Sequence, residues 1–181
     1  VNGDQGGGNK LQGLAPTTNK KVEFVLRNIQ KRAYGEKRNY VFCMNQIGGI
    51  GAVGSGNRSR TFATTSDGVK DCIPGNKGPL VGILTGIKWA IKHTKSSWIV
   101  TFPVDSPFFP DNMVLRFLEE SDGYDVLIAK SLRRIHPVFS MWRVSSEIEE
   151  QLENSIRKDE RKIDRVTKKF KTKVVNFKYI R

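Results

Sequence analysis

The stretch WIVTFPVDSPFFP, residues 98–110, begins as an apolar run and ends as a turn rich in proline. The run from Trp98 to Phe102 has the length and composition of a short buried strand. Three prolines restrict the backbone that follows and surround one acidic residue, Asp105. The stretch therefore predicts a strand whose carboxyl end leads into a rigid turn with a single carboxylate.

Patterns typical of strands and helices alternate on both sides of this stretch. Further strands are predicted at residues 39–45, 124–131, 137–142 and 173–177, and helices at residues 22–29, 79–91, 147–156 and 159–171. Residues 46–68 hold five glycines between positions 48 and 56 and are predicted to be a long mobile loop or a poorly ordered insert. The alternation favours an α/β fold with a mainly parallel sheet, and residues 1–181 are predicted to form one domain.

Two helices can be given a buried face from the sequence. The first starts at Pro79, a favourable first-turn residue after Gly78. Its apolar stripe is predicted to consist of Leu80, Ile83, Leu84, Ile87, Ala90 and Ile91. Asp111 is expected to cap the second helix, and the apolar residues of that helix are Val114, Leu115 and Leu118.

The composition narrows the class of protein. The chain has 181 residues and a formal net charge of +13, which favours polyanionic partners such as nucleic acid, nucleoside triphosphates or phosphorylated metabolites. Few aromatic residues accompany the basic C-terminal region, so nucleic acid is the less favoured partner. No apolar run has the length of a membrane span and no secretory signal is expected. Cys43 and Cys72 form no disulfide framework or metal-ligand spacing, which favours the cytoplasm.

Three polar residues are predicted to follow strands. Ligands of open α/β sheets bind beyond the carboxyl ends of the strands, so Asp105 could hold Mg²⁺, which takes few protein ligands. Asp105 could equally cap a turn through its side chain. Asp71 has the same two interpretations, because it follows a short strand and precedes the segment CIPGNKGP. Asn45 could contact a ribose or a base edge, although a strand-end Asn alone is weak support for that role.

Two further segments could contact an anion. In GGGNK, Gly7 and Gly8 could expose backbone N–H groups to a phosphate, and Lys10 could add a charge. The segment lacks the Gly-Lys-Ser/Thr ending of a Walker A motif, and a flexible tail is the simpler interpretation. In RRIHPVF, His136 lies beside two arginines and could be a base, a phosphate donor or an ordinary loop residue.

Four motifs in this order give the chain a family resemblance: GPLVGILTGI, IVTFPVDSPFFP, HPVFSMW and DERKIDRV. Together they cover about residues 69–177 and resemble the MobA-like molybdenum cofactor guanylyltransferases. The resemblance implies a three-layer, Rossmann-like nucleotidyltransferase fold and a GTP- and Mg²⁺-dependent transfer of GMP to molybdopterin. The turn PVDSP favours this branch over the cytidylyl-transferring relatives, which carry a Gly-Asp-Met-Pro type turn.

The resemblance also implies roles for individual residues. Asp105 resembles the acid at the Mg²⁺ and phosphate site, Asp71 the acid that contacts guanosine, and Asn45 a strand-end residue that touches the nucleotide. Lys10, with Gly7 and Gly8 before it, resembles the end of the nucleotide loop. The residues implied on the pterin side are His136 and Arg161.

Residues 1–66 do not follow the family pattern and are expected to be partly disordered. Molybdoenzymes or their chaperones are further partners that the resemblance implies. Two alternatives remain open from the sequence. One is a related cytidylyl or sugar-phosphate nucleotidyltransferase, and the other is a non-catalytic basic binding domain.

Overall fold

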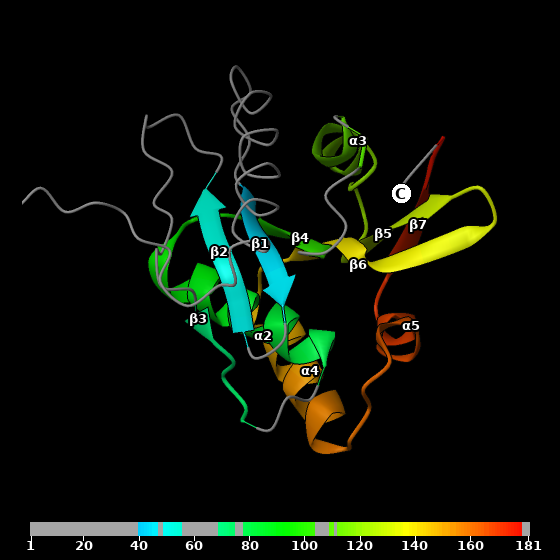
Figure 1. Cartoon of the computed structure of the whole chain (residues 1–181). Helices are drawn as coiled ribbons and strands as arrows, with labels where there is room; N and C mark the ends of the chain where they lie inside the picture. The colour runs from blue at the N-terminus through cyan, green and yellow to red at the C-terminus, as the bar shows by residue number, and fades with distance from the viewer. Residues whose placement is uncertain are drawn as a thin grey trace, which may run out of the picture.

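The computed structural model describes residues 40–46, 49–55, 69–74, 78–103, 109–110 and 112–178, with the backbone alone described before residue 71. Figure 1 shows a sheet with helices packed against it. The strands are β1 (Tyr40–Gln46), β2 (Gly49–Ser55), β3 (Val69–Lys70), β4 (Trp98–Pro103), β5 (Val126–Ser131), β6 (Arg134–Arg143) and β7 (Thr172–Phe177). The helices are α2 (Pro79–His93), α3 (Met113–Glu119), α4 (Ser146–Arg157), α5 (Ile163–Val166) and the 3₁₀-helix η1 (Thr167–Lys169).

The described strands form one sheet in the order β3-β2-β1-β4-β6-β5-β7. Strands β1, β3, β4, β5 and β7 all run in one direction, whereas β2 and β6 run in the other. The predicted α/β fold is confirmed, and the sheet is mainly parallel in strand direction. The neighbouring pairs are nevertheless mostly antiparallel, because the two reversed strands are inserted between the others. Only β1–β4 and β5–β7 are parallel neighbours.

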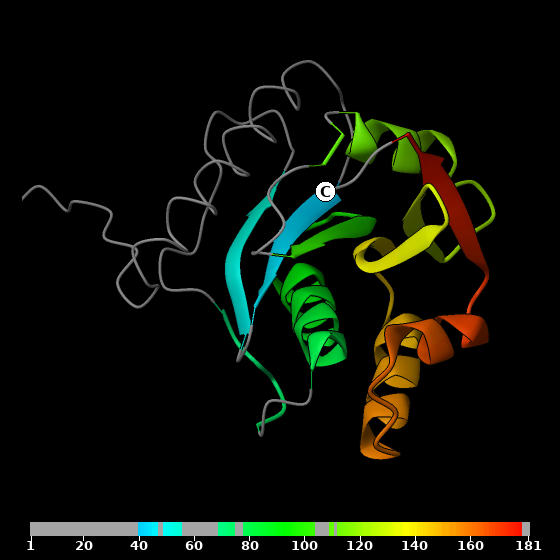
Figure 2. The same ribbon diagram turned by 45° about the vertical axis from the view of Figure 1, so that its right-hand side comes forward.

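The sheet separates two apolar clusters, because the side chains of a strand alternate between its faces. On β4, Trp98, Val100 and Phe102 belong to the cluster that contains Met113 and Phe117 of α3. Ile99 belongs to the other cluster, which contains the buried residues of α2, α4 and α5. Figures 1 and 2 show α3 on one side of the sheet and α2 and α4 together on the other. This arrangement has the three layers that the resemblance implied.

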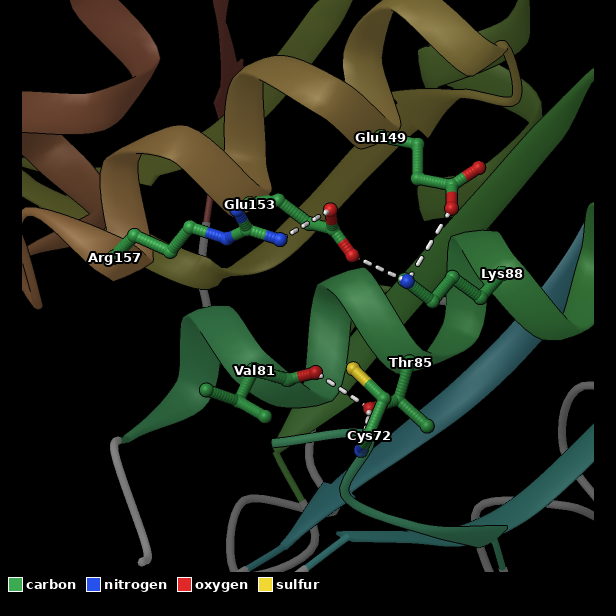
Figure 3. Close-up of polar contacts among 7 residues, drawn as sticks. All are labelled: Cys72, Val81, Thr85, Lys88, Glu149, Glu153 and Arg157. Atoms are coloured by element: carbon green, nitrogen blue, oxygen red, sulfur yellow. Dashed lines mark hydrogen bonds and ion pairs between the residues drawn. The ribbon is translucent and has the colours of Figure 1, made fainter. Parts of the chain in front are cut away.

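Side-chain contacts fix the helices and strands that lie around the middle of the sheet. Lys88 of α2 forms ion pairs with Glu149 and Glu153 of α4. Figure 3 shows these charges bridging the two helices. Inside the sheet, the hydroxyls of Thr101 and Ser140 are 2.9 Å apart, and the indole N–H of Trp142 donates to Ser140 Oγ at 2.8 Å. The buried polar groups of β4 and β6 therefore satisfy one another.

Two predictions about regular structure were wrong. The glycine-rich residues 46–68 were predicted as a loop or insert, but β2 lies within them and pairs with β1. Three of the seven residues of β2 are glycine, so few side chains remain to show an alternation, and the backbone pairing defines the strand. A helix was predicted over 159–171, but the structure has only α5 and η1 there. Asp159 has a φ of 60°, which lies outside the right-handed helical region and prevents a helix from starting at that residue.

The buried faces of two helices also differ from their predictions. Ile91 is 40% exposed, whereas the rest of the predicted α2 stripe is buried. In α3 the fully buried residues are Met113 and Phe117, and Val114, Leu115 and Leu118 are only partly buried. The predicted helix at 22–29 and the predicted cap at Asp111 lie outside the described residues.

Candidate functional site

The carboxyl ends of β1, β3 and β4 lie along one edge of the sheet, because these strands share a direction. Asn45 near the end of β1 is in register with Pro103 of β4 on one side and with Ile50 of β2 on the other. Ile50 is in turn in register with Val69 of β3. Asp71 follows β3 directly. The structure therefore brings the backbone of Asn45 and residue Asp71 to the edge at which β4 also ends.

Asp71 carries an unsatisfied buried oxygen. Its side chain is partly buried, and Oδ1 is inaccessible to solvent without a hydrogen-bond partner among the described residues. Burial raises the pKa of this carboxyl above its ordinary value, because the charged form loses hydration. A buried acceptor that lacks a partner destabilises the fold, so this carboxyl is a strained element of the edge rather than a fully satisfied core group.

Hydrogen bonds to α2 hold the segment that carries Asp71. The backbone N–H of Cys72 donates to Thr85 Oγ1 at 3.0 Å, and the Thr85 hydroxyl donates to the carbonyl of Val81 at 2.7 Å. Figure 3 shows this chain of contacts from the β3–α2 connection into the helix. Because Thr85 is buried, the backbone next to Asp71 is anchored on the core rather than on the surface.

The start of α2 also lies on this connection. Gly78 precedes the helix with a φ of 85°, a conformation that residues with a Cβ rarely adopt. Pro79 then begins the helix, as the sequence predicts, and no acidic side chain lies in its first turn. The N-terminal end of a helix carries partial positive charge, so this end complements an anion.

His136 lies on the other side of β4. Strand β6 runs antiparallel to β4 with Ser140 opposite Thr101, so the residues before Ser140 extend past the carboxyl end of β4. His136 Nε2 is 2.8 Å from the Oγ of Ser131, the last residue of β5. Burial, and secondarily the charge of Arg134, lower the pKa of His136 below its ordinary value. The ring is therefore neutral at pH 7, so a base or a neutral hydrogen-bonding group fits this position better than a cation does.

Three phenylalanine rings connect this region to the predicted acidic turn. Phe102 at the end of β4 contacts Phe109 with ring centroids 4.7 Å apart, and both rings contact Phe139 of β6. The His136 ring lies edge-on to Phe139. Asp105 lies outside the described residues. Phe102 before it and Phe109 after it both pack against Phe139, on the strand that carries His136.

The other predicted site residues are not part of this group. Arg161 is exposed on the connection between α4 and α5, where its Nε bonds Asp159 Oδ1 at 2.9 Å. No contact within the described part of the chain links Arg161 to Asp71 or His136. Gly7, Gly8 and Lys10 lie outside the described residues, as does the side chain of Asn45.

The residues that the structure describes contain no group of three or more His, Cys, Asp or Glu side chains arranged to hold a metal ion. None of their helices combines the length and apolarity needed to cross a membrane.

The sheet and the helices on its two faces define an α/β protein. Polar side chains lie beyond the carboxyl ends of its strands, where proteins of this class bind ligands. The sequence profile of the MobA-like NTP transferase domain matches residues 50–172, about two thirds of the chain. The chain belongs to this family.

Individual relatives agree with the family match. A molybdenum cofactor guanylyltransferase of Rhizobium rhizogenes is 46% identical over 96 residues, which are 52% of this chain and 44% of that protein. A molybdenum cofactor guanylyltransferase of Nitrobacter hamburgensis is 31% identical over 132 residues, which are 71% of this chain and 61% of that protein. The crystal structure of the protein Aq1419 from Aquifex aeolicus VF5 matches with a TM-score of 0.50 and 22% sequence identity. The match covers 60% of this chain and 54% of the Aq1419 chain, and it supports the fold alone. The chain spans about half the length of the curated relatives it matches.

Sequence reasoning missed Ser131, Thr85 and Phe109. Ser131 reads as an ordinary strand residue, and Thr85 lies within the apolar stripe of α2. The motif HPVF gives a signal for Phe139, but the packing of Phe109 against it depends on a contact across 30 positions of the chain.

Proposed function

We propose that this chain transfers GMP from GTP to molybdopterin and releases pyrophosphate. The two relatives described above are named molybdenum cofactor guanylyltransferase, and the family match covers the segment that includes Asp71 and His136. The observation that carries the proposal is the family match over residues 50–172, and the carboxyl of Asp71, partly buried at the carboxyl edge, is proposed to accept from the base. The reaction is expected to take place in the cytoplasm, with molybdoenzymes or their chaperones as further partners.

Asp71 is suited to selecting guanine. Guanine presents two adjacent donors, the ring N–H and the exocyclic amine, and a carboxylate has two oxygens that can accept from both. Adenine and cytosine lack this pair of donors. A nucleotide that lacks this pair of donors would make fewer hydrogen bonds to the Asp71 carboxyl, and this difference would favour GTP.

The residues of the proposed site belong to strands on opposite sides of β4, which supports a division into two halves. Asn45 and Asp71 belong to the half formed by β1, β2 and β3, and His136 belongs to the half formed by β5 and β6. In the proposed complex, GTP occupies the first half and molybdopterin the second. Arg134 and His136 would then meet the phosphate of molybdopterin, and the turn after β4 would lie between the two substrates.

Mg²⁺ fits the chemistry of this edge. The ion prefers oxygen ligands and keeps several waters while it binds substrate phosphates, so it does not require a cluster of protein ligands. Asp71 brings a carboxylate to the edge, and Asp105 is the residue proposed to hold the ion. When bound, Mg²⁺ would supply neutralisation of charge on the triphosphate.

The protein aligns the reacting groups in the proposed reaction. A terminal phosphate oxygen of molybdopterin attacks the α-phosphorus of GTP and forms a new P–O bond. The bond from the α-phosphorus to the bridging oxygen breaks, and pyrophosphate leaves with the electron pair. Such a reaction needs orientation and complementary charge more than a covalent protein nucleophile. Asp71 orients the base, the start of α2 and Lys10 complement the phosphates, and His136 orients the acceptor.

A label-transfer assay tests this proposal. The purified chain is incubated with molybdopterin, Mg²⁺ and GTP labelled at the α-phosphate, and the label is expected in a dinucleotide with one pyrophosphate per product. Asp105→Asn should abolish the transfer and leave the fold intact. Asp122→Asn is the matched control, because Asp122 is exposed on a turn away from the edge. Equal transfer from CTP, or full activity of Asp105→Asn, would contradict the proposal.

A further inference from the structure

Ser131 and His136 form a polar pair at the end of the β5–β6 hairpin. Ser131 is 4% exposed, and its Oγ is 2.8 Å from Nε2 of His136. Figure 2 shows the hairpin and strand β7 at the side of the sheet away from β1 and β2. The pair therefore belongs to the half of the edge that β5 and β6 form.

The direction of this hydrogen bond follows from the burial of Ser131. A buried hydroxyl needs an acceptor for its proton, and an unmet donor destabilises the fold. Among the described residues, the hydrogen-bond partner of Ser131 Oγ is Nε2 of His136. If Nε2 were protonated, the ring would donate to Ser131 and the hydroxyl proton would still lack an acceptor. The hydroxyl therefore donates to Nε2, and the neutral ring carries its proton on Nδ1.

The Nδ1–H group is then the free donor of the pair. Among the residues that the structure describes, no acceptor lies within hydrogen-bond distance of it. Arg134, on the same strand, is exposed and close enough to influence the titration of His136. A neutral N–H donor beside a guanidinium matches a phosphate oxygen, which accepts hydrogen bonds and carries negative charge.

We propose that Ser131 is a positioning residue that holds the Nδ1–H form of His136, so that Nδ1–H donates to the phosphate of the co-substrate. The inference rests on the proposed function, because that reaction supplies the co-substrate phosphate. Ser131 itself does not touch the substrate in this account. Its effect on the reaction comes through the tautomer and orientation of the imidazole.

Nitrogen-15 NMR of the imidazole rings tests the positioning directly and needs no activity. The chain has two histidines, and His93, exposed in the last turn of α2, is the internal reference. In the wild-type chain at pH 7.5 or above, His136 should show a protonated Nδ1 and an unprotonated Nε2. Ser131→Ala should shift it toward the mixture seen for His93, and Ser131→Thr should restore the wild-type form. A protonated Nε2 in the wild type, or no change in Ser131→Ala, would overturn the inference.

Kinetics then tests the link to the co-substrate. Ser131→Ala should raise the KM for molybdopterin by on the order of ten-fold, as expected for one hydrogen bond to a charged group, and leave the KM for GTP unchanged. Ser131→Thr should restore the lower KM. An equal rise in both KM values would indicate a general loss of structure and overturn the assignment to the co-substrate. If the wild type has the expected tautomer but transfers no GMP, the proposed function fails while the positioning of His136 by Ser131 stands.

Discussion

Replacement of Asp71 by Asn should make the ligand-free protein more stable at neutral pH. Burial raises the pKa of Asp71 above the ordinary value of 3.8, so the folded state holds the proton more tightly than the unfolded state does. The wild type therefore loses stability as the pH rises from 3.8 through the folded pKa, and the loss is complete above that pKa. Asn has no charge to bury, so Asp71→Asn avoids this loss.

The size of the effect follows from the environment of the side chain. Asn keeps a neutral polar group at the same position, so the variant removes only the added cost of burying the charge. An unsatisfied buried polar group costs about 1–3 kcal/mol, and the charge accounts for part of such a cost. Asp71 has one buried oxygen and is otherwise partly exposed, so solvent screening favours the lower end, about 1 kcal/mol. For a chain of this size, that difference corresponds to an increase in Tm of about 2–4 °C.

Thermal unfolding at several pH values measures this effect, with Asp122→Asn as the control. The increase for Asp71→Asn should be present at pH 7 and absent at about pH 3. Saturating GTP with Mg²⁺ should reverse the order, because the wild type would gain more stability from the nucleotide that Asp71 is proposed to bind. A lower Tm for Asp71→Asn at pH 7 without ligand, or an increase that persists at pH 3, would refute the reasoning.

Three predictions concern the framework around the site. Ser140→Ala leaves the indole N–H of Trp142 without its acceptor and should destabilise the protein by about 1–3 kcal/mol in urea unfolding; the loss should shrink in a Trp142→Phe background, and an equal loss there would contradict the assignment. Lys88→Met removes two ion pairs of a partly exposed side chain and should reduce stability by less than about 1 kcal/mol. That difference should diminish in 1 M NaCl, and a salt-independent loss would point to packing instead. Leu84→Ala should reduce the free energy of unfolding by about 2–5 kcal/mol, because Leu84 is fully buried. Ile91→Ala should have a much smaller effect, because Ile91 is 40% exposed. Equal losses in the two variants would contradict the described core.

Strands and helices with long apolar patterns were predictable, because residues that face the core recur at regular spacings in the sequence. The run at Trp98–Phe102 became β4, and the stripe after Gly78 became α2. Strand β2 could not be predicted in this way. Its glycines have no side chains to alternate between faces, and its place depends on pairing with β1.

The candidate site was predictable only in part. The sequence shows where an apolar run stops, so Asp71 and Asn45 could be proposed as strand-end residues. It does not show that their strands end at the same edge, because this depends on the reversed direction of β2, which lies between β1 and β3. The contact of Ser131 with His136 depends on the hairpin that joins two strands, and the unpaired oxygen of Asp71 depends on what the fold packs around it.

A guanine nucleotide site is proposed at the edge that holds Asp71. Its test is calorimetric titration of the purified chain with GTP, CTP and ATP, each with and without Mg²⁺ at physiological salt. We expect saturable, Mg²⁺-enhanced binding that favours GTP, with the preference for guanine lost in Asp71→Asn and kept in Asp122→Asn. Binding of all three nucleotides with equal affinity, or no binding by a folded chain, would contradict it.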